Sequence, residues 1–229
     1  LDIPLTGNFS GTNRETWFTN MLASSGSGST PLRVALTQAG EYYRTTTGDA
    51  DPWGPEEPDG LLGCRQSFTI LTTDGYWGDV FTLPADTNSD GTEARPFRDT
   101  HSNTLADVAM YYYKRDLRSG ITNEVPTSAR DSANWQHMVT FGLSLGVTGT
   151  LDPATALPAL TAGTLNWPDP ALTSPAKLDD LLDKLMAGEE VGSPRGATLT
   201  SWREAERVLA GFPDGRADEG PSAGPASLL

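Results

Sequence analysis

The chain has 229 residues, a formal net charge of −14 and 37% hydrophobic residues, which is enough for one α/β domain with a proper core or for a domain followed by a tail. Its acidity excludes a nucleic-acid-binding role, because no basic stripe offsets repulsion from phosphates. No apolar run approaches the roughly 20 residues of a membrane-spanning helix.

Two helices are predicted near the amino end, where the chain opens at Leu1 without Met or a signal peptide, as a processed product or an internal fragment does. The first covers residues 13–23 and gathers its large apolar residues on one face. The second runs from Thr30 to about residue 43, since Thr30 suits the N-cap and Pro31 suits the first helical position. Its apolar stripe consists of Leu32, Ala35, Leu36 and Ala39.

A buried strand is predicted before Asp74, where a run of β-branched and aromatic residues stops abruptly at Asp74-Gly75. In open α/β sheets, ligands and ions bind at the carboxyl edge of the strands. An ionised Asp there is costly to desolvate unless it meets a cation or hydrogen-bond donors. Asp74 is therefore either part of a cation site or an acceptor of backbone N–H groups in a tight turn.

The next two elements are a helix and a second strand. Ser102 or Asn103 is expected to cap a helix that runs to about Leu117. Residues 137–147 alternate apolar with small side chains, which predicts a strand whose small-residue face lets a helix pack closely. Helix and strand alternate along residues 1–150, so an α/β fold with parallel crossovers is expected. The helix's inward-facing residues are predicted to be Leu105, Val108, Ala109 and Tyr112.

Three further segments follow this α/β region. Residues 151–175 form a Pro-rich linker, and residues 176–211 form a helical segment with helices near 176–187 and 202–210. Residues 212–229 are rich in Pro, Gly, Ala and charge, a composition typical of a disordered tail.

A second possible cation site lies in Asp86-Thr-Asn-Ser-Asp-Gly91. Asp86, Asn88 and Asp90 stand at positions 1, 3 and 5 of a calcium loop, and Gly91 at position 6. Position 12, which needs a bidentate Glu, is Phe97, so the first interpretation is a polar loop and a weak calcium site is the alternative. No nucleophile-elbow motif accompanies the two histidines, and His137 is interpreted as structural. We expect no enzymatic activity.

Several distinctive strings occur along residues 11–182. They are Gly28-Ser-Thr-Pro-Leu-Arg33, Cys64-Arg-Gln-Ser-Phe-Thr-Ile-Leu-Thr-Thr-Asp-Gly-Tyr-Trp77, Ser102-Asn-Thr-Leu-Ala-Asp-Val-Ala-Met-Tyr-Tyr-Tyr-Lys-Arg-Asp-Leu117, residues 123–128 and Trp135-Gln-His-Met-Val-Thr-Phe-Gly142. Together these strings resemble the PilC/PilY family of type IV pilus biogenesis and pilus-tip adhesion proteins.

This resemblance implies a partial von Willebrand A-like domain, a doubly wound and mostly parallel sheet with flanking helices that lacks its first strand. Such domains often bind a divalent cation through three loops: an Asp-x-Ser-x-Ser motif, a Thr and an Asp. Carried over by position, Thr30 and Asp74 are the second and third of these, and Thr30 has its N-cap role as the alternative. The first loop is expected before Leu1, so the site is incomplete. Its oxygen ligands suit Mg²⁺ or Ca²⁺.

The resemblance further implies an adhesin or pilus biogenesis function at the cell surface or outside the cell. The expected partners are pilus components, a host or surface ligand and the family's propeller region, which this chain lacks. Two alternatives stay open: an A-domain scaffold of an intracellular metal-dependent enzyme assembly, and a truncated nonfunctional product.

Overall fold

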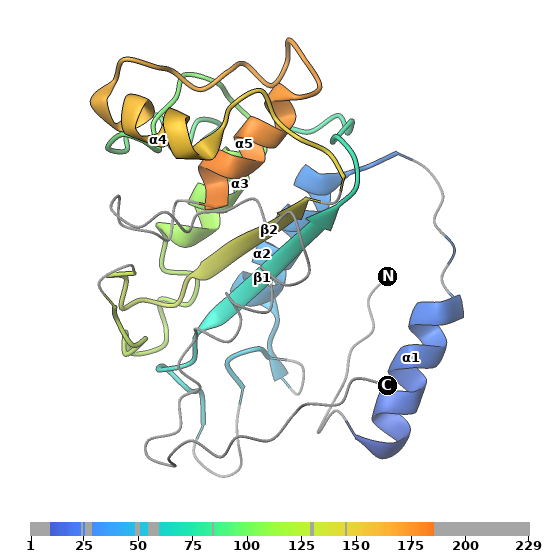
Figure 1. The fold of residues 1–229 in the computed structure, drawn as a ribbon. Coiled ribbons are helices and arrows are strands. Elements are labelled where there is room, and N and C mark those ends of the chain that lie inside the picture. Colours follow the sequence, from blue (N-terminus) through green and yellow to red (C-terminus); the bar gives the residue numbers. More distant parts are fainter. Residues whose placement is uncertain are drawn as a thin grey trace, which may run out of the picture.

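The computed structural model describes residues 10–23, 25, 29–48, 51–54, 60–83, 85–128, 131–144 and 146–185 (Figure 1). The predicted helix at 202–210 and the predicted tail at 212–229 lie outside these residues. Helices and strands alternate through most of the described chain, which confirms the α/β class. In chain order the elements are α1 (Gly11–Ala23), α2 (Leu32–Thr45), β1 (Ser67–Thr73), α3 (Leu105–Tyr113), β2 (Met138–Ser144), α4 (Pro153–Ala162) and α5 (Ala176–Leu185).

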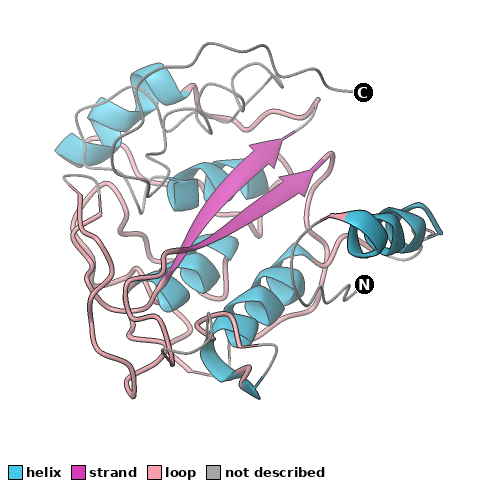
Figure 2. Cartoon of the chain, turned by 90° about the horizontal axis from the view of Figure 1, so that it is seen from below, coloured by secondary structure: helices cyan, strands magenta, loops and turns pink. Residues whose placement is uncertain are grey.

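β1 and β2 form a parallel pair, with Ser67 opposite Met138 and Thr73 opposite Ser144. Two parallel strands need a long crossover, and here residues 74–137 with α3 supply it. This confirms the predicted parallel connection. Because the strands point the same way, their carboxyl ends meet at one edge of the sheet, as the two arrows in Figure 2 show. These are the only strands among the described residues, so the doubly wound sheet is seen only in part.

One face of the sheet carries the core. Thr140, Gly142 and Ser144 are buried on the small-residue face of β2, and α3 packs against that strand, as predicted. α2 lies behind β1 in Figure 1, and Leu36 joins Leu71 in the same buried cluster. All four residues predicted to face inward from α3 are buried, with Leu105, Val108 and Tyr112 fully enclosed.

The other face of β1 is open to solvent. Phe68 is 40% exposed and Ile70 is 55% exposed, opposite Val139 and Phe141 on β2. The expectation of a buried strand therefore holds for one face of β1 and is wrong for the other. The physical reason is that α2 and α3 pack on the face of the sheet that carries Leu71. The apolar residues on the opposite face of β1 are not covered by these helices.

The helix starts differ from the predicted ones. Pro31, not Thr30, is the N-cap of α2 and gives no side-chain cap; the carboxylate of Asp79 accepts the Val34 N–H at 3.2 Å instead. α3 begins at Leu105 behind Thr104, which forms a reciprocal capping box with Asp107. Asn103 has a φ of 61°, a left-handed backbone conformation unlike the extended one of an N-cap, so neither it nor Ser102 caps the helix.

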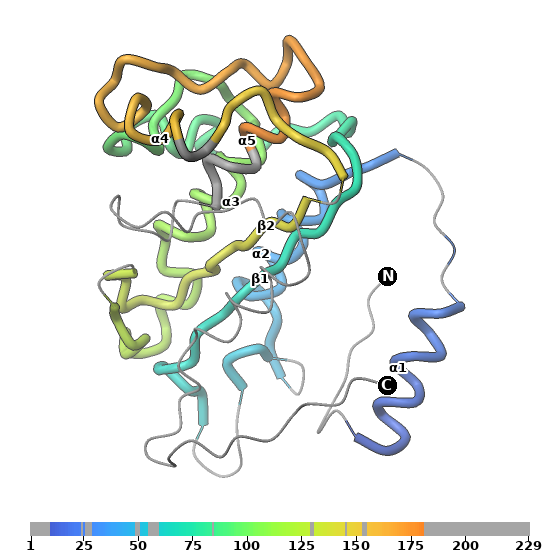
Figure 3. The backbone as a smooth tube through the Cα atoms, viewed as in Figure 1, coloured from blue at the N-terminus to red at the C-terminus, as the bar shows by residue number. Residues whose placement is uncertain are grey.

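The carboxyl-terminal part of the described chain packs onto the amino end of α3. The stretch expected to be a linker contains α4, whose Ala156 and Leu160 bury with Trp167 in a small separate cluster. Figure 3 traces the chain from β2 through α4 to α5 at one end of the body. α5 packs against α3 and β2, and Leu178 enters the main core.

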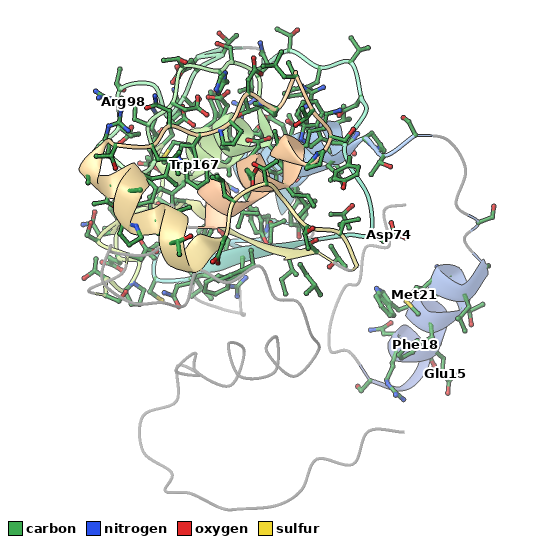
Figure 4. All side chains as sticks on the ribbon, turned by 45° about the horizontal axis from the view of Figure 1, so that its top comes forward. Glu15, Phe18, Met21, Asp74, Arg98 and Trp167 are labelled. Atoms are coloured by element: carbon green, nitrogen blue, oxygen red, sulfur yellow. The ribbon has the colours of Figure 1, made fainter. Side chains whose placement is uncertain are left out.

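α1 stands apart from this body in Figures 1 and 4, and none of its residues is buried. Leu22 is 78% exposed, and the rings of Trp17 and Phe18 meet edge to face at 5.1 Å. None of the helices in the described part of the chain has the length and apolarity needed to cross a membrane.

Candidate functional site

The structure brings the Thr30 and Asp74 loops together at the carboxyl edge of the sheet. Thr30 directly precedes the cap of α2, and Asp74 directly follows β1. The two loops are joined by a hydrogen bond from the Gly78 N–H to the Thr30 carbonyl at 3.2 Å. Figure 4 shows Asp74 at the rim of the main body. Two of the three loops expected for a cation site are therefore neighbours.

Both predicted ligands have uncommitted oxygens. Asp74 is exposed, and within the described chain its carboxylate makes no hydrogen bond or ion pair. Thr73 builds the turn instead: its hydroxyl accepts the Gly75 N–H at 3.1 Å and donates to the Gly75 carbonyl at 2.9 Å. The interpretation of Asp74 as a backbone acceptor in this turn is wrong. Thr30 likewise has no capping bond that competes with a ligand role, because Pro31 is the N-cap.

A buried arginine fixes the loop that follows Asp74. Arg33 is only 7% exposed, and its guanidinium lies 3.8 Å from the Trp77 ring centroid. Its Nε contacts the Asp79 carboxylate at 3.2 Å, and its NH1 donates to the Asn103 carbonyl at 2.9 Å. Lys177 holds Trp77 through the backbone, since Nζ donates to the Trp77 carbonyl at 2.8 Å. The Asp74 loop is thus anchored to α2 and α5.

Sequence reasoning missed Arg33, although a signal exists. Arg33, Leu36 and Gly40 are spaced by three and four residues and share the buried face of α2. A charged residue on that face requires a buried acidic partner, and the sequence does not reveal that Asp79 is that partner.

The second predicted site does not assemble as a calcium loop. Asp86 faces outward to two cations, with Oδ2 3.6 Å from Lys114 Nζ and in contact with the Arg115 guanidinium. Asp90, in contrast, is 1% exposed, and neither of its carboxylate oxygens has a hydrogen-bond partner among the described residues. Asp86 therefore pairs with basic side chains, whereas Asp90 is buried without a partner among the described residues.

Buried carboxylates surround the amino end of α3. Asp107 accepts the Ser89 N–H at 2.7 Å and the Thr104 N–H at 2.9 Å, and burial raises the pKa of Asp107 to about 7. Asp180 accepts the first two N–H groups of α3, each at 2.9 Å. Burial also raises the pKa of Asp99 to about 6. The Thr104-x-x-Asp107 spacing is a readable signal for one of these acids.

His137 is held as a structural residue. It is 3% exposed, its Nε2 lies 2.8 Å from an Asp131 carboxylate oxygen, and its Nδ1 lies 2.6 Å from the Trp135 carbonyl. Both ring nitrogens therefore have partners, as the sequence interpretation expects. Across the described residues, no group of three or more His, Cys, Asp or Glu side chains is arranged to hold a metal ion.

Parallel strands, flanking helices and an acidic loop at the carboxyl edge define an α/β region compatible with a Rossmann-like or von Willebrand A-like fold. No family model matches the sequence, and no solved structure matches it. The sequence is similar to Type IV pilus biogenesis factor PilY1 of Pseudomonas aeruginosa in three strains. In strain PAK it is 32% identical over 198 residues, which is 70% of this chain and 17% of the relative.

The other two strains agree. The relative in strain PAO1 is 32% identical over 197 residues, 70% of this chain and 17% of its own length. That in strain UCBPP-PA14 is 34% identical over 164 residues, 58% of this chain and 13% of its own length. The chain belongs to the PilY1/PilC-type family of type IV pilus proteins, and it spans about a sixth of the length of its two longest matches.

Proposed function

We propose that this chain is a region of a type IV pilus protein that serves pilus biogenesis and surface adhesion without catalysis. The observation that carries the proposal is the 32% identity over 70% of the chain to proteins named as pilus biogenesis factors. Its partners are then pilus components and a host or surface ligand, and its place is the cell surface or the extracellular space.

The mechanism we propose is cation-bridged recognition by a von Willebrand A-like domain. Thr30 and Asp74 supply a hydroxyl and a carboxylate oxygen to Mg²⁺ or Ca²⁺ from two hydrogen-bonded loops. The remaining ligands are an acidic loop from another part of the parent protein, water and a carboxylate of the bound partner. Both oxygens lack competing bonds within the described chain, and this supports the assignment.

The anchoring of the Asp74 loop supports this mechanism. Arg33 and Asp79 fix the loop to the start of α2, the helix that follows Thr30. A cation ligand on an anchored loop loses less conformational freedom on binding than one on a mobile loop. The two ligands are thus preorganised relative to each other.

The proposal is tested in cells that make the full-length parent protein with Asp74→Ala. We expect fewer surface pili or weaker attachment, with unchanged protein abundance. Glu124→Ala is the matched control, because Glu124 is an exposed acid in the loop between α3 and β2. Normal piliation and normal attachment in the Asp74→Ala strain would contradict the cation mechanism. Deletion of residues 29–185 with no effect on either readout would contradict the assignment to pilus function.

A further inference from the structure

The turn at residues 88–91 holds three buried oxygens that have no hydrogen-bond partner in the described chain. Two are the carboxylate oxygens of Asp90, and the third is Oδ1 of Asn88. The Asn88 amide folds over Gly91, because a Cβ at Gly91 would stand 2.1 Å from Asn88 Oδ1. Native proteins rarely leave buried acceptors unpaired, so three of them in one turn suit a bound cation or hydrogen-bond donor.

The surroundings of Asp90 are acidic. Burial, and after it the charges of Asp99, Asp107 and Asp180, raise the pKa of Asp90 to about 9. Asp107 already accepts hydrogen bonds from three donors, and Asp180 accepts them from two backbone N–H groups of α3. The backbone N–H of Asp99 acts in the opposite direction and lowers this pKa, although neither Asp90 oxygen has a hydrogen-bond partner among the described residues.

Lys114, the C-cap residue of α3, contacts this loop and is already engaged. Lys114 Nζ donates to the Ser89 carbonyl and to Glu93 Oε1, and lies 3.6 Å from the Asp86 carboxylate. Lys114 thus pairs with Asp86 and Glu93, and among the described residues no basic side chain forms an ion pair with Asp90. Two species can relieve a buried carboxylate of this kind: a proton or a metal ion.

We propose that a divalent cation, Ca²⁺ by its chemistry, binds at Asp90 with the Asp90 carboxylate and Asn88 Oδ1 as ligands. All these donors are oxygens, one of them a neutral amide, which suits Ca²⁺ and not Zn²⁺. The described chain has no cluster of three acids or histidines, so backbone carbonyls and water complete the shell. Ca²⁺ accepts such irregular sites, whereas Mg²⁺ demands near-ideal octahedral geometry.

This ligand set differs from both earlier expectations. It excludes Asp86, the first position of the calcium-loop pattern, because that carboxylate pairs with Lys114 and Arg115. It is also independent of Thr30 and Asp74. The two proposed cation sites share no ligand residue, so each can be tested without the other.

The test is calorimetric titration of the full chain with Ca²⁺, carried out in an Asp74→Ala background that removes the proposed adhesion site. We expect saturable binding and a rise in Tm with Ca²⁺. Asp90→Asn keeps the size of the side chain but removes its charge, and it should weaken Ca²⁺ binding by at least about tenfold. Loss of a residue that only supports a metal ligand already costs about tenfold or more in affinity. Asp86→Asn is the control and should leave the affinity within about twofold, because a surface pair adds little.

A second variant keeps the proposal falsifiable if Asp90→Asn does not fold. Asn88→Ala removes the amide ligand and should also weaken Ca²⁺ binding by about tenfold. Absence of Ca²⁺ binding in the chain that retains Asp90 and Asn88 would overturn the proposal and assign a proton to Asp90. Equal loss of affinity in Asp86→Asn and Asp90→Asn would overturn the ligand set.

Discussion

The contact between α2 and α3 depends on a glycine. A Cβ at Gly40 would stand 2.4 Å from Cγ of Tyr112 and 2.5 Å from both Cδ atoms, so the ring lies flat against the helix backbone. Tyr112 is fully buried, and its hydroxyl donates to Glu41 Oε1 at 2.8 Å. The ring is held at both ends and cannot retreat without loss of packing or of this bond. Gly40→Ala is therefore an informative perturbation.

Two opposed effects decide the sign of this change. Alanine in a helix is favoured over glycine by about 1 kcal/mol. Overpacking of a tight interface costs about 1–3 kcal/mol, and three ring atoms within 2.5 Å of the new methyl group place this case at the upper end. The expected net loss is about 2 kcal/mol of unfolding free energy, or a Tm decrease of about 4–8 °C for a chain of this size.

Urea and thermal unfolding measure the effect. Gly120→Ala is the control, because a Cβ at Gly120 meets nothing within 4 Å, and it should change stability by less than about 0.5 kcal/mol. In a Tyr112→Leu background the cost of Gly40→Ala should shrink by about 1 kcal/mol or more, since the clashing ring is gone. If Gly40→Ala instead stabilises the protein by the helix-propensity amount, the described packing of α2 on α3 is refuted.

Three further predictions concern the core, the buried ion pair and pH. Leu71→Ala should cost about 2–4 kcal/mol in urea unfolding, whereas Ile70→Ser on the open face should cost less than about 1 kcal/mol; similar values would contradict the one-sided sheet. Arg33→Met should cost about 3 kcal/mol and speed hydrogen exchange in residues 75–83, because a buried carboxylate loses its partner; unchanged exchange would contradict the anchoring. Burial raises the pKa of Asp131, but the hydrogen bond and the charge of His137 lower it by a larger amount. The pKa of Asp131 in the folded protein is therefore below its value in the unfolded chain. The stability from this pair is then complete above about pH 4 and is lost as pH falls through the folded pKa, and Asp131→Asn should flatten that acid limb of the urea midpoint; an unaltered acid limb would argue against it.

The sequence predicts those features that depend on local pattern. The alternation around Phe141 identifies β2 and its small-residue face, because side chains on a strand alternate with a period of two. Val108 and Tyr112 are four residues apart, close to the 3.6-residue turn of a helix, and this spacing identifies the buried side of α3. The abrupt Asp74-Gly75 ending correctly places the end of β1.

Features set by distant partners are not predictable in this way. Asp79 caps α2 from 45 residues away, which the sequence around Thr30 cannot reveal. The open face of Ile70 depends on which helices cover the sheet, since an apolar strand looks the same whether one or both faces are covered. Asp90 looks like one ligand of a regular calcium loop, and only the structure shows that it is buried while Asp86 pairs with surface cations.

The most direct test of the central claim is the divalent-cation affinity of the full-length parent protein, measured in an Asp90→Asn background so that the site proposed at Asp90 does not contribute. The account predicts saturable Mg²⁺ or Ca²⁺ binding that is lost with Asp74→Ala, weakened at least about tenfold with Thr30→Ala and retained with Glu124→Ala. Binding that is unchanged by Asp74→Ala would contradict it.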